Sequence, residues 1–379
     1  MGDVSSEHRI LQGTARRYIG TANDEDLLAA LTPPIDWPLL LLISSKEGMA
    51  GVAAHQLQQL SESRDLELPL DSFAEALNGV FFKNGNHFAE LARLHRRLVR
   101  GDVKVLLLKG SALIETVYRG QMGLRPLSDV DVLVRSSDVA FLQEELGSLG
   151  FHSPTPSRSF FTNGPVAFDV HTDLIGAGRI RRRSLAVEFD GESLWTRSLP
   201  VESGASHLRV LCSEHQFLHL AVHALKHSYN RMIWLVDLGL VSKQLDWSEL
   251  LRVAEAYGAL RPTAYAARCL ETVMGIEIPG DVRRALPRLN RLEWGFLDLV
   301  KRRRPEMEAF GEPLVAFSIP TWRGRLAYLY EYLFPSLRVL VGEAAPPAAW
   351  RVYSHRLGQI CKRVFFLLKG WFGSLLHRA

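Results

Sequence analysis

Residues 99–175 alternate between short apolar runs and helical patterns, and this alternation constrains the fold more than any other feature of the sequence. The continuous apolar run 103–108 is typical of a buried strand, and the segment 109–120 has the spacing of a helix of two to three turns. A second strand pattern follows at 124–134. We therefore predict a small α/β unit whose strands are separated by helices.

The second half of this unit has the pattern of a helix followed by a hairpin. The helix is expected to begin at an N-cap serine, Ser136 or Ser137, and to end at one of the glycines within 147–150. Asn163-Gly164 then separates two apolar-rich runs, which is the strongest short signal for a β-hairpin. The predicted order is strand, helix, strand, helix, hairpin.

Helical patterns flank this unit on both sides. The N-terminal flank is helical from Asp24, the expected N-cap, to Gly101, which is expected to end the last of these helices. Residues 176–205 are less regular, and helical spacing resumes after Ser206. We predict four parts: an N-terminal helical region 1–98, a core 99–205, a C-terminal helical domain 206–345 and a basic apolar tail 346–379.

Two aspartates, Asp129 and Asp131, interrupt the apolar pattern of the second strand. Alternation along a strand places both carboxylates on one face and the intervening valines on the other. Charged groups on a strand that enters a core are costly unless something compensates them. Carboxylates about 6–7 Å apart can bracket two divalent ions, and Mg²⁺ or Mn²⁺ accepts such oxygen ligands.

A third carboxylate, Asp169, lies in the second strand of the predicted hairpin and could complete such a metal site. Asp173 is its rival, but it lies where strand pairing is expected to end. His171 shares the phase of Asp169, and we expect it to support the site or lie on the surface rather than bind an ion.

A Gly-Ser turn follows the first predicted strand and opens the next helix. The backbone N–H groups of Gly110 and Ser111 can bind phosphate there, and glycine permits a close approach. Lys109 can add a positive charge to the same phosphates. Arg125, in the loop before the aspartates, could reach a triphosphate or simply lie exposed.

In this order, the strand, the Gly-Ser turn, the helix and the aspartate-bearing strands resemble the polymerase-beta-like nucleotidyltransferase superfamily. More narrowly, the chain is similar to the bacterial family labelled uncharacterised nucleotidyltransferase over roughly residues 80–245. The stretches that carry this similarity are LLLKGSALIETVY, LRPLSDVDVLV, FDVHTDL and HALKHSYNRMIWLVDLGLV.

The resemblance implies an α+β fold, in which a small mixed sheet with flanking helices lies between N- and C-terminal helical regions. It implies metal-dependent transfer of a nucleoside monophosphate from an NTP to a hydroxyl of a small molecule, peptide or protein, with release of pyrophosphate. Gly110 and Ser111 would bind the nucleotide's phosphates, and Asp129 and Asp131 would hold two Mg²⁺ or Mn²⁺ ions. Asp169 would share one ion and help to activate the acceptor hydroxyl.

Four histidines recur at every fourth position in the helical pattern 213–230. No glutamate completes an H-E-x-x-H zinc motif, so we expect this stripe to line a cleft between the helical half and the core. His223, Lys226 and His227 match a pattern of the family and are candidates for substrate contact. Asp237 is a candidate partner for one of these groups.

Composition disfavours several other classes of function. The net charge of +4 is too small to argue for nucleic-acid binding, and the arginine runs 181–183 and 302–304 are expected to be solvated faces. The first residues lack the pattern of a secretory signal, and no apolar run approaches the ~20 residues of a membrane span. A cytoplasmic location is expected.

Two alternatives remain open from the sequence. Residues 362–379 combine Lys and Arg with bulky apolar side chains, and they could lie on an anionic membrane surface or dock on the helical core. The chain could also be a catalytically weak nucleotide-binding or scaffold protein of a biosynthetic cluster, although the intact set of aspartates argues against this.

Overall fold

The computed structural model describes residues 5–31, 34–154, 159–176, 180–303, 307–308 and 310–336, together with a few positions between 353 and 365. The segment 362–379, for which membrane contact or docking was left open, lies almost entirely outside the described residues. Among the helices of the described part, none is long and apolar enough to cross a membrane.

A six-stranded mixed sheet forms the centre of the core. Its strands are β1 (Val105–Leu107), β2 (Val130–Leu133), β3 (Phe160–Thr162), β4 (Ala167–His171), β5 (Leu199–Pro200) and β6 (Leu208–Val210). They lie in the order β3-β4-β2-β1-β6-β5, in which β2 is parallel to β4 and antiparallel to β1. The prediction of an α+β fold with a small mixed sheet and flanking helices is confirmed. The sequence did not reveal β5 and β6, which are only two and three residues long.

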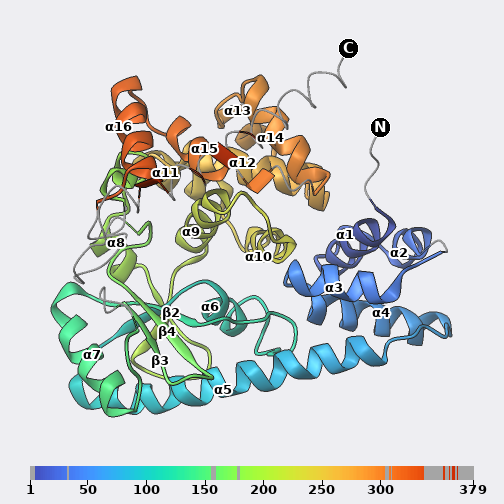
Figure 1. Ribbon diagram of the computed structural model, residues 1–379, viewed down its shortest axis with the longest axis horizontal. Coiled ribbons are helices and arrows are strands. Elements are labelled where there is room, and N and C mark those ends of the chain that lie inside the picture. The colour runs from blue at the N-terminus through green and yellow to red at the C-terminus, as the bar shows by residue number, and fades with distance from the viewer. Residues whose placement is uncertain are drawn as a thin grey trace.

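One face of the sheet packs against two helices, α5 (Asp71–Gly101) and α7 (Val139–Ser148); Figure 1 shows α5 beneath the sheet and α7 at its left. Val130 and Val132 of β2 are buried in that apolar cluster, together with Leu94 and Leu142 from the helices. The predicted alternation along β2 is therefore confirmed, because it leaves Asp131 on the other face of the sheet.

The end of α5 differs from the prediction. Gly101 does not stop the helix but is its last residue, and the left-handed conformation is adopted by Asp102, with a φ of 50°. The ring of Phe141 on α7 explains the glycine, because a Cβ at Gly101 would lie 2.2 Å from its Cζ atom. Glycine here serves close helix packing rather than helix termination.

The hairpin is confirmed: β3 and β4 are antiparallel neighbours, and the Asn163 N–H donates to the carbonyl of Val166 at 3.2 Å. The helix after β1 is shorter than expected. It is α6 (Lys109–Glu115), and turns rather than helix lead on to Gly120.

Four helices precede α5: α1 (Ser6–Tyr18), α2 (Asp24–Ala30), α3 (Trp37–Lys46) and α4 (Ala50–Arg64). The N-cap of α2 is Asn23 rather than the expected Asp24. The Asn23 side chain accepts from the N–H of Asp26, whose carboxylate accepts from the N–H of Asn23. Asp24 instead pairs with Arg17 on α1, at 2.7 Å.

The C-terminal half is helical, and most of its helices share one apolar core with α1–α4, whereas α8 and α13 pack in separate apolar clusters. The helices are α8 (Gly191–Thr196), α9 (Ser213–Lys226), α10 (Met232–Ser242), α11 (Trp247–Ala256), α12 (Leu260–Cys269), α13 (Gly280–Ala285), α14 (Arg291–Lys301), α15 (Gly311–Phe317) and α16 (Trp322–Leu333). Figure 1 shows α9 and α10 above the sheet and α6, on the side opposite α5. Most of the residues of α9 are buried.

Both arginine runs depart from the expectation of solvated faces. Arg183 forms an ion pair with Glu312 on α15 at 2.5 Å, and its side chain is largely buried. Arg303 is buried and pairs with Glu47, while its guanidinium also donates to the carbonyl of Tyr229 at 2.8 Å. In each run, one arginine is buried, and a carboxylate that is distant in sequence neutralises its charge.

Candidate active site

Three side chains, those of Asp131, Asp169 and His171, meet on the upper face of the sheet, where β2 and β4 run side by side. Asp131 and Asp169 are direct partners in this parallel pair, so their carboxylates lie on the same face. The Nε2 atom of His171 lies 2.8 Å from Asp131 Oδ1 and 3.1 Å from Asp169 Oδ2. One ligand atom from each residue lies within 4.8 Å of the others. The structure thus brings together the two aspartates and His171, which supports the carboxylates rather than lying on the surface.

Lys109 reaches the same carboxylates from the neighbouring strand β1. It follows β1 by two residues, and its ammonium donates to Asp131 Oδ1. Its φ of 48° is uncommon for a residue other than glycine. The side chain of this strained residue is directed at the carboxylates. Strained backbone conformations are enriched at functional sites.

Opposite charges decide the protonation of this cluster. Burial alone would raise the pKa of Asp131, but Lys109 and His171 outweigh burial and hold that pKa well below its usual range. Burial alone would lower the pKa of His171, but hydrogen bonds to Asp131 and Asp169 raise it to about 9. At neutral pH, therefore, the ionised carboxylate of Asp131 faces a protonated histidine and an ammonium.

Asp129 lies just before β2 and is half-buried. The hydroxyl of Ser128 donates to its Oδ1 atom at 2.6 Å. Burial and then the neighbouring charge of Asp131 raise the pKa of Asp129. A carboxylate pushed toward neutrality by a like charge gains from any cation bound between the two.

The donor set fits a hard divalent ion. Asp131 and Asp169 offer carboxylate oxygens, which Mg²⁺ and Mn²⁺ accept, and His171 offers a nitrogen when deprotonated. Among the described residues Asp129 is not part of this group of three, although the charge of Asp131 acts on it. Lys109 and His171 now supply positive charge at the same oxygens. A bound ion would therefore take over the neutralisation of the carboxylates that Lys109 and His171 provide in its absence.

The Gly-Ser turn lies at the start of α6, as predicted, but both of its residues are buried. Ser111 is buried, and its hydroxyl donates to the carbonyl of Leu108 at 2.9 Å. A Cβ at Gly110 would lie 2.4 Å from Leu127 Cδ2 and 2.7 Å from Arg125 Nη1. Any phosphate contact at this turn would have to use the backbone N–H groups, which have no partner within a helix in its first turn.

This packing predicts that Gly110→Ala lowers stability although the substitution adds only one methyl group. Overpacking of this kind costs about 1–3 kcal/mol. Gly147→Ala in α7 is the matched control, because a Cβ there meets nothing within 4 Å, and alanine favours a helix by up to about 1 kcal/mol. Urea unfolding of both variants measures the difference. Equal stability of the two would contradict the packing assigned to Gly110.

Arg125 is buried rather than exposed, and its guanidinium pairs with Asp237 on α10. The Nη2 atom lies 2.9 Å from Asp237 Oδ2, and the Tyr118 hydroxyl donates to Oδ1 at 2.8 Å. The expectation that Asp237 pairs with one of the groups on α9 is wrong, because Arg125 and Tyr118 occupy both of its oxygens. The triad ties the loop before β2 and the Gly110 turn to the C-terminal helices.

Removing the charge of Asp237 should be costly because it leaves Arg125 buried without a counter-ion. We expect Asp237→Asn to lower the free energy of unfolding by about 3–5 kcal/mol. Glu192→Gln breaks an ion pair with Arg135 in which both side chains are exposed, and it should cost no more than about 1 kcal/mol. Chemical denaturation tests both, and a small effect of Asp237→Asn would show that the ion pair is dispensable.

The histidines along α9 lie in two different environments. His215, at the start of the helix, lies 3.1 Å from the hydroxyl of Tyr257. Further along, His219 is buried, and its pKa is lowered well below the usual value by burial and then by the charge of Lys109. His223 experiences the same two effects. The second half of α9 therefore faces the carboxylate cluster. Lys226 is the last residue of this helix, and His227 follows it as the C-cap.

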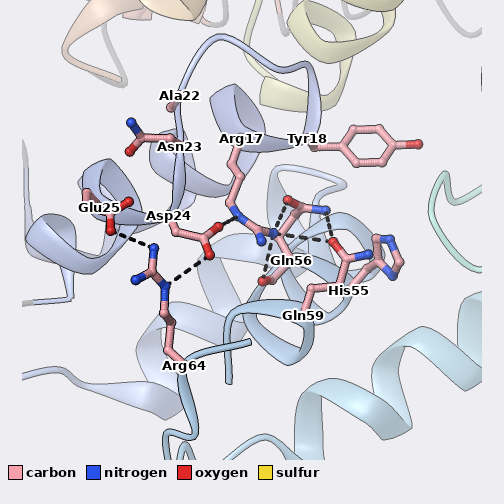
Figure 2. A pocket seen from close by; sticks show the side chains of 10 residues that line it. All are labelled: Arg17, Tyr18, Ala22, Asn23, Asp24, Glu25, His55, Gln56, Gln59 and Arg64. Carbon is pink, nitrogen blue, oxygen red and sulfur yellow. Dashed lines mark hydrogen bonds and ion pairs between the residues drawn. The ribbon is translucent and has the colours of Figure 1, made fainter. Parts of the chain in front are cut away.

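A hollow of about 640 Å³ lies among the N-terminal helices, at α1, α2 and α4 (Figure 2). Its charged side chains bind one another: Arg64 pairs with Asp24 and Glu25, while Arg17 pairs with Asp24 and donates to Gln56. These side chains therefore neutralise one another. It contains none of the residues of the carboxylate cluster.

A mixed sheet with carboxylates on paired strands, beside a Gly-Ser turn that opens a helix, has the elements of a nucleotidyltransferase. The chain belongs to the uncharacterised nucleotidyltransferase family, whose model matches residues 33–275. This match confirms the resemblance found in the sequence and extends it at both ends. No curated protein and no solved structure matches the chain.

Proposed function

We propose that this protein transfers a nucleoside monophosphate from an NTP to a hydroxyl of a small molecule, peptide or protein, and releases pyrophosphate. The observation that carries the proposal is the pairing of Asp131 with Asp169 on neighbouring parallel strands, with Asp129 two residues before Asp131. Two carboxylates on one face of a sheet, with a third just before one of the strands, suit divalent ions and a polyphosphate better than they suit a neutral substrate.

In this proposal Asp129 and Asp131 would hold two Mg²⁺ or Mn²⁺ ions, and Asp169 would share one of them. The ions would neutralise charge on the phosphates when bound. The backbone at Gly110 and Ser111 would hold the phosphates, and Lys109 would exchange its contact with Asp131 for a contact with them. Arg125 would act through the Gly110 turn, against which its guanidinium packs.

The acceptor would approach from the side of β4, where Asp169 would accept a hydrogen bond from its hydroxyl. The acceptor oxygen forms a bond to the α-phosphorus, and the bond from that phosphorus to the β-phosphate oxygen breaks. The hydroxyl proton passes to Asp169, and pyrophosphate leaves. Most of the rate enhancement in such a reaction comes from positioning and from compensation of charge.

Incubation with each α-labelled NTP and a cell extract, with Mg²⁺, Mn²⁺ or EDTA, tests the proposal. We expect label to appear in a metabolite, peptide or protein with at least one NTP, and only when a divalent ion is present. Tight NTP binding without any label transfer would instead support a nucleotide-binding or scaffold role.

A further inference from the structure

Lys226, the last residue of α9, is a largely buried cation beside the carboxylate cluster. Its Nζ atom donates to the carbonyl of Ile175 at 3.2 Å, and no ion pair joins it to a carboxylate in the described part of the chain. The other buried cations near the site differ in this respect: Lys109 pairs with Asp131, Arg125 with Asp237 and Arg183 with Glu312.

Arg183 lies beside Lys226, and two carboxylates, Glu312 and Asp173, partly offset its effect on the ammonium. Arg183 donates to the carbonyls of Ile175 and Gly176, so the guanidinium and the ammonium converge on one piece of backbone. Burial and then the charge of Arg183 lower the pKa of Lys226 to about 7. A buried ammonium next to a guanidinium is costly, and an anion bound there would remove that cost.

The position of Lys226 relative to the strands of the sheet indicates which of the two substrates it could bind. Ile175 and Gly176 lie in the segment that leaves β4, and Asp173 shapes this segment because its Oδ1 atom accepts from both N–H groups. The strand order places β4 on one side of β2 and β1, with the Gly110 turn after it, on the other. Lys226 therefore contacts the segment that follows the strand of Asp169, whereas Lys109 and the Gly110 turn follow β1.

Aromatic side chains adjoin the same corner. The rings of His223 and His227 lie 5.1 and 5.5 Å from the ring of Trp234 on α10. Between the two helices, Ser228 and Tyr229 both have positive φ, and the N–H of Gly311 donates to the Ser228 hydroxyl at 2.8 Å. This connection between α9 and α10 is therefore held in a sparsely populated backbone conformation by a contact with α15.

We propose that Lys226 binds an oxyanion of the acceptor, so that the acceptor is a hydroxyl compound that also carries a phosphate or carboxylate group. This inference rests on the proposed function. It assigns the cation that contacts the segment after β4 to the acceptor and leaves the nucleotide phosphates to Lys109 and the Gly110 turn.

The test separates the acceptors of a cell extract by anion exchange into a bound and an unbound fraction. Wild type is then assayed with the labelled NTP that it uses. We expect transfer of α-label to the bound, anionic fraction alone. Treatment of that fraction with alkaline phosphatase, or carbodiimide amidation of its carboxylates, should abolish transfer and would tell a phosphate from a carboxylate. Transfer to the unbound fraction, or persistence after both treatments, would overturn the inference.

Variants assign the effect to Lys226. Lys226→Gln should raise the apparent KM for the anionic fraction about 10- to 100-fold, because one charge-assisted hydrogen bond is lost, and should leave the KM for NTP unchanged. Lys226→Arg should restore part of the acceptor affinity, and the exposed Lys243→Gln should match wild type. A change in the KM for NTP instead would contradict the assignment.

Thermal unfolding separates binding from a structural role. Lys226→Gln removes an unpaired buried charge and should melt at the same temperature as wild type or higher. A lower melting temperature would identify a structural lysine and overturn the inference. A wild type that transfers no label to any fraction would refute the proposed function itself, and the inference with it.

Discussion

Asp169→Asn is expected to lower the rate of nucleotidyl transfer by about three orders of magnitude while leaving the affinity for Mg²⁺–NTP largely intact. Asp169 lies on β4 beside Asp131, and in the proposal it orients the acceptor hydroxyl and takes its proton. The amide keeps the shape of the side chain and can still accept from His171, but it has lost the charge and the basicity. Loss of an interaction made chiefly in the transition state reduces turnover more than binding.

Asp173→Asn is the matched control for this variant. Asp173 accepts from the N–H groups of Ile175 and Gly176, and the carbonyl oxygen of an asparagine can do the same. We expect this variant to retain nearly wild-type turnover. Pyrophosphate release measures both variants, and an active Asp169→Asn beside an inactive Asp173→Asn would reverse the assignment.

The double variant Asp129→Asn with Asp131→Asn is expected to lose detectable binding of Mg²⁺–NTP. Both carboxylates must be charged to hold two ions, and the nucleotide enters with the ions. The variant also frees Lys109, which would then be a buried cation without its carboxylate partner. Titration calorimetry with each NTP, with and without Mg²⁺, measures the loss.

Folding of the double variant has to be controlled, because Asp131 is 5% exposed and paired with both Lys109 and His171. The single variant Asp129→Asn leaves those pairs in place and should fold like wild type while binding Mg²⁺–NTP more weakly. Unchanged affinity in the double variant, with its fold intact, would mean that these two aspartates do not form the metal site.

Local sequence signals were sufficient for the elements that carry the carboxylates. The alternation of residues 130–133 predicted the face on which Asp131 lies, and Asn163-Gly164 predicted the hairpin that contains Asp169. The phase that places Asp131 and Asp169 on one face was readable because the side-chain period of a strand is two. His171 has the same phase, and this was the signal for its place between the two aspartates.

Pairings between distant residues could not be read from the sequence. Arg125 and Asp237 are 112 positions apart, and either could have been a surface residue by its local pattern. The same holds for Arg183 with Glu312, where the arginine sits in a run typical of an exposed face. Burial of such charges depends on which helices pack together, and composition and periodicity do not specify that.

The position of the label in the product tests the central claim most directly. Wild type is incubated with its acceptor and Mg²⁺, in parallel with NTP labelled at the α-phosphate and at the γ-phosphate. Nucleotidyl transfer predicts α-label in the modified acceptor and γ-label in pyrophosphate, with neither product formed by Asp131→Asn. Appearance of γ-label in the acceptor would show phosphoryl transfer instead and would contradict the role proposed for the carboxylate cluster.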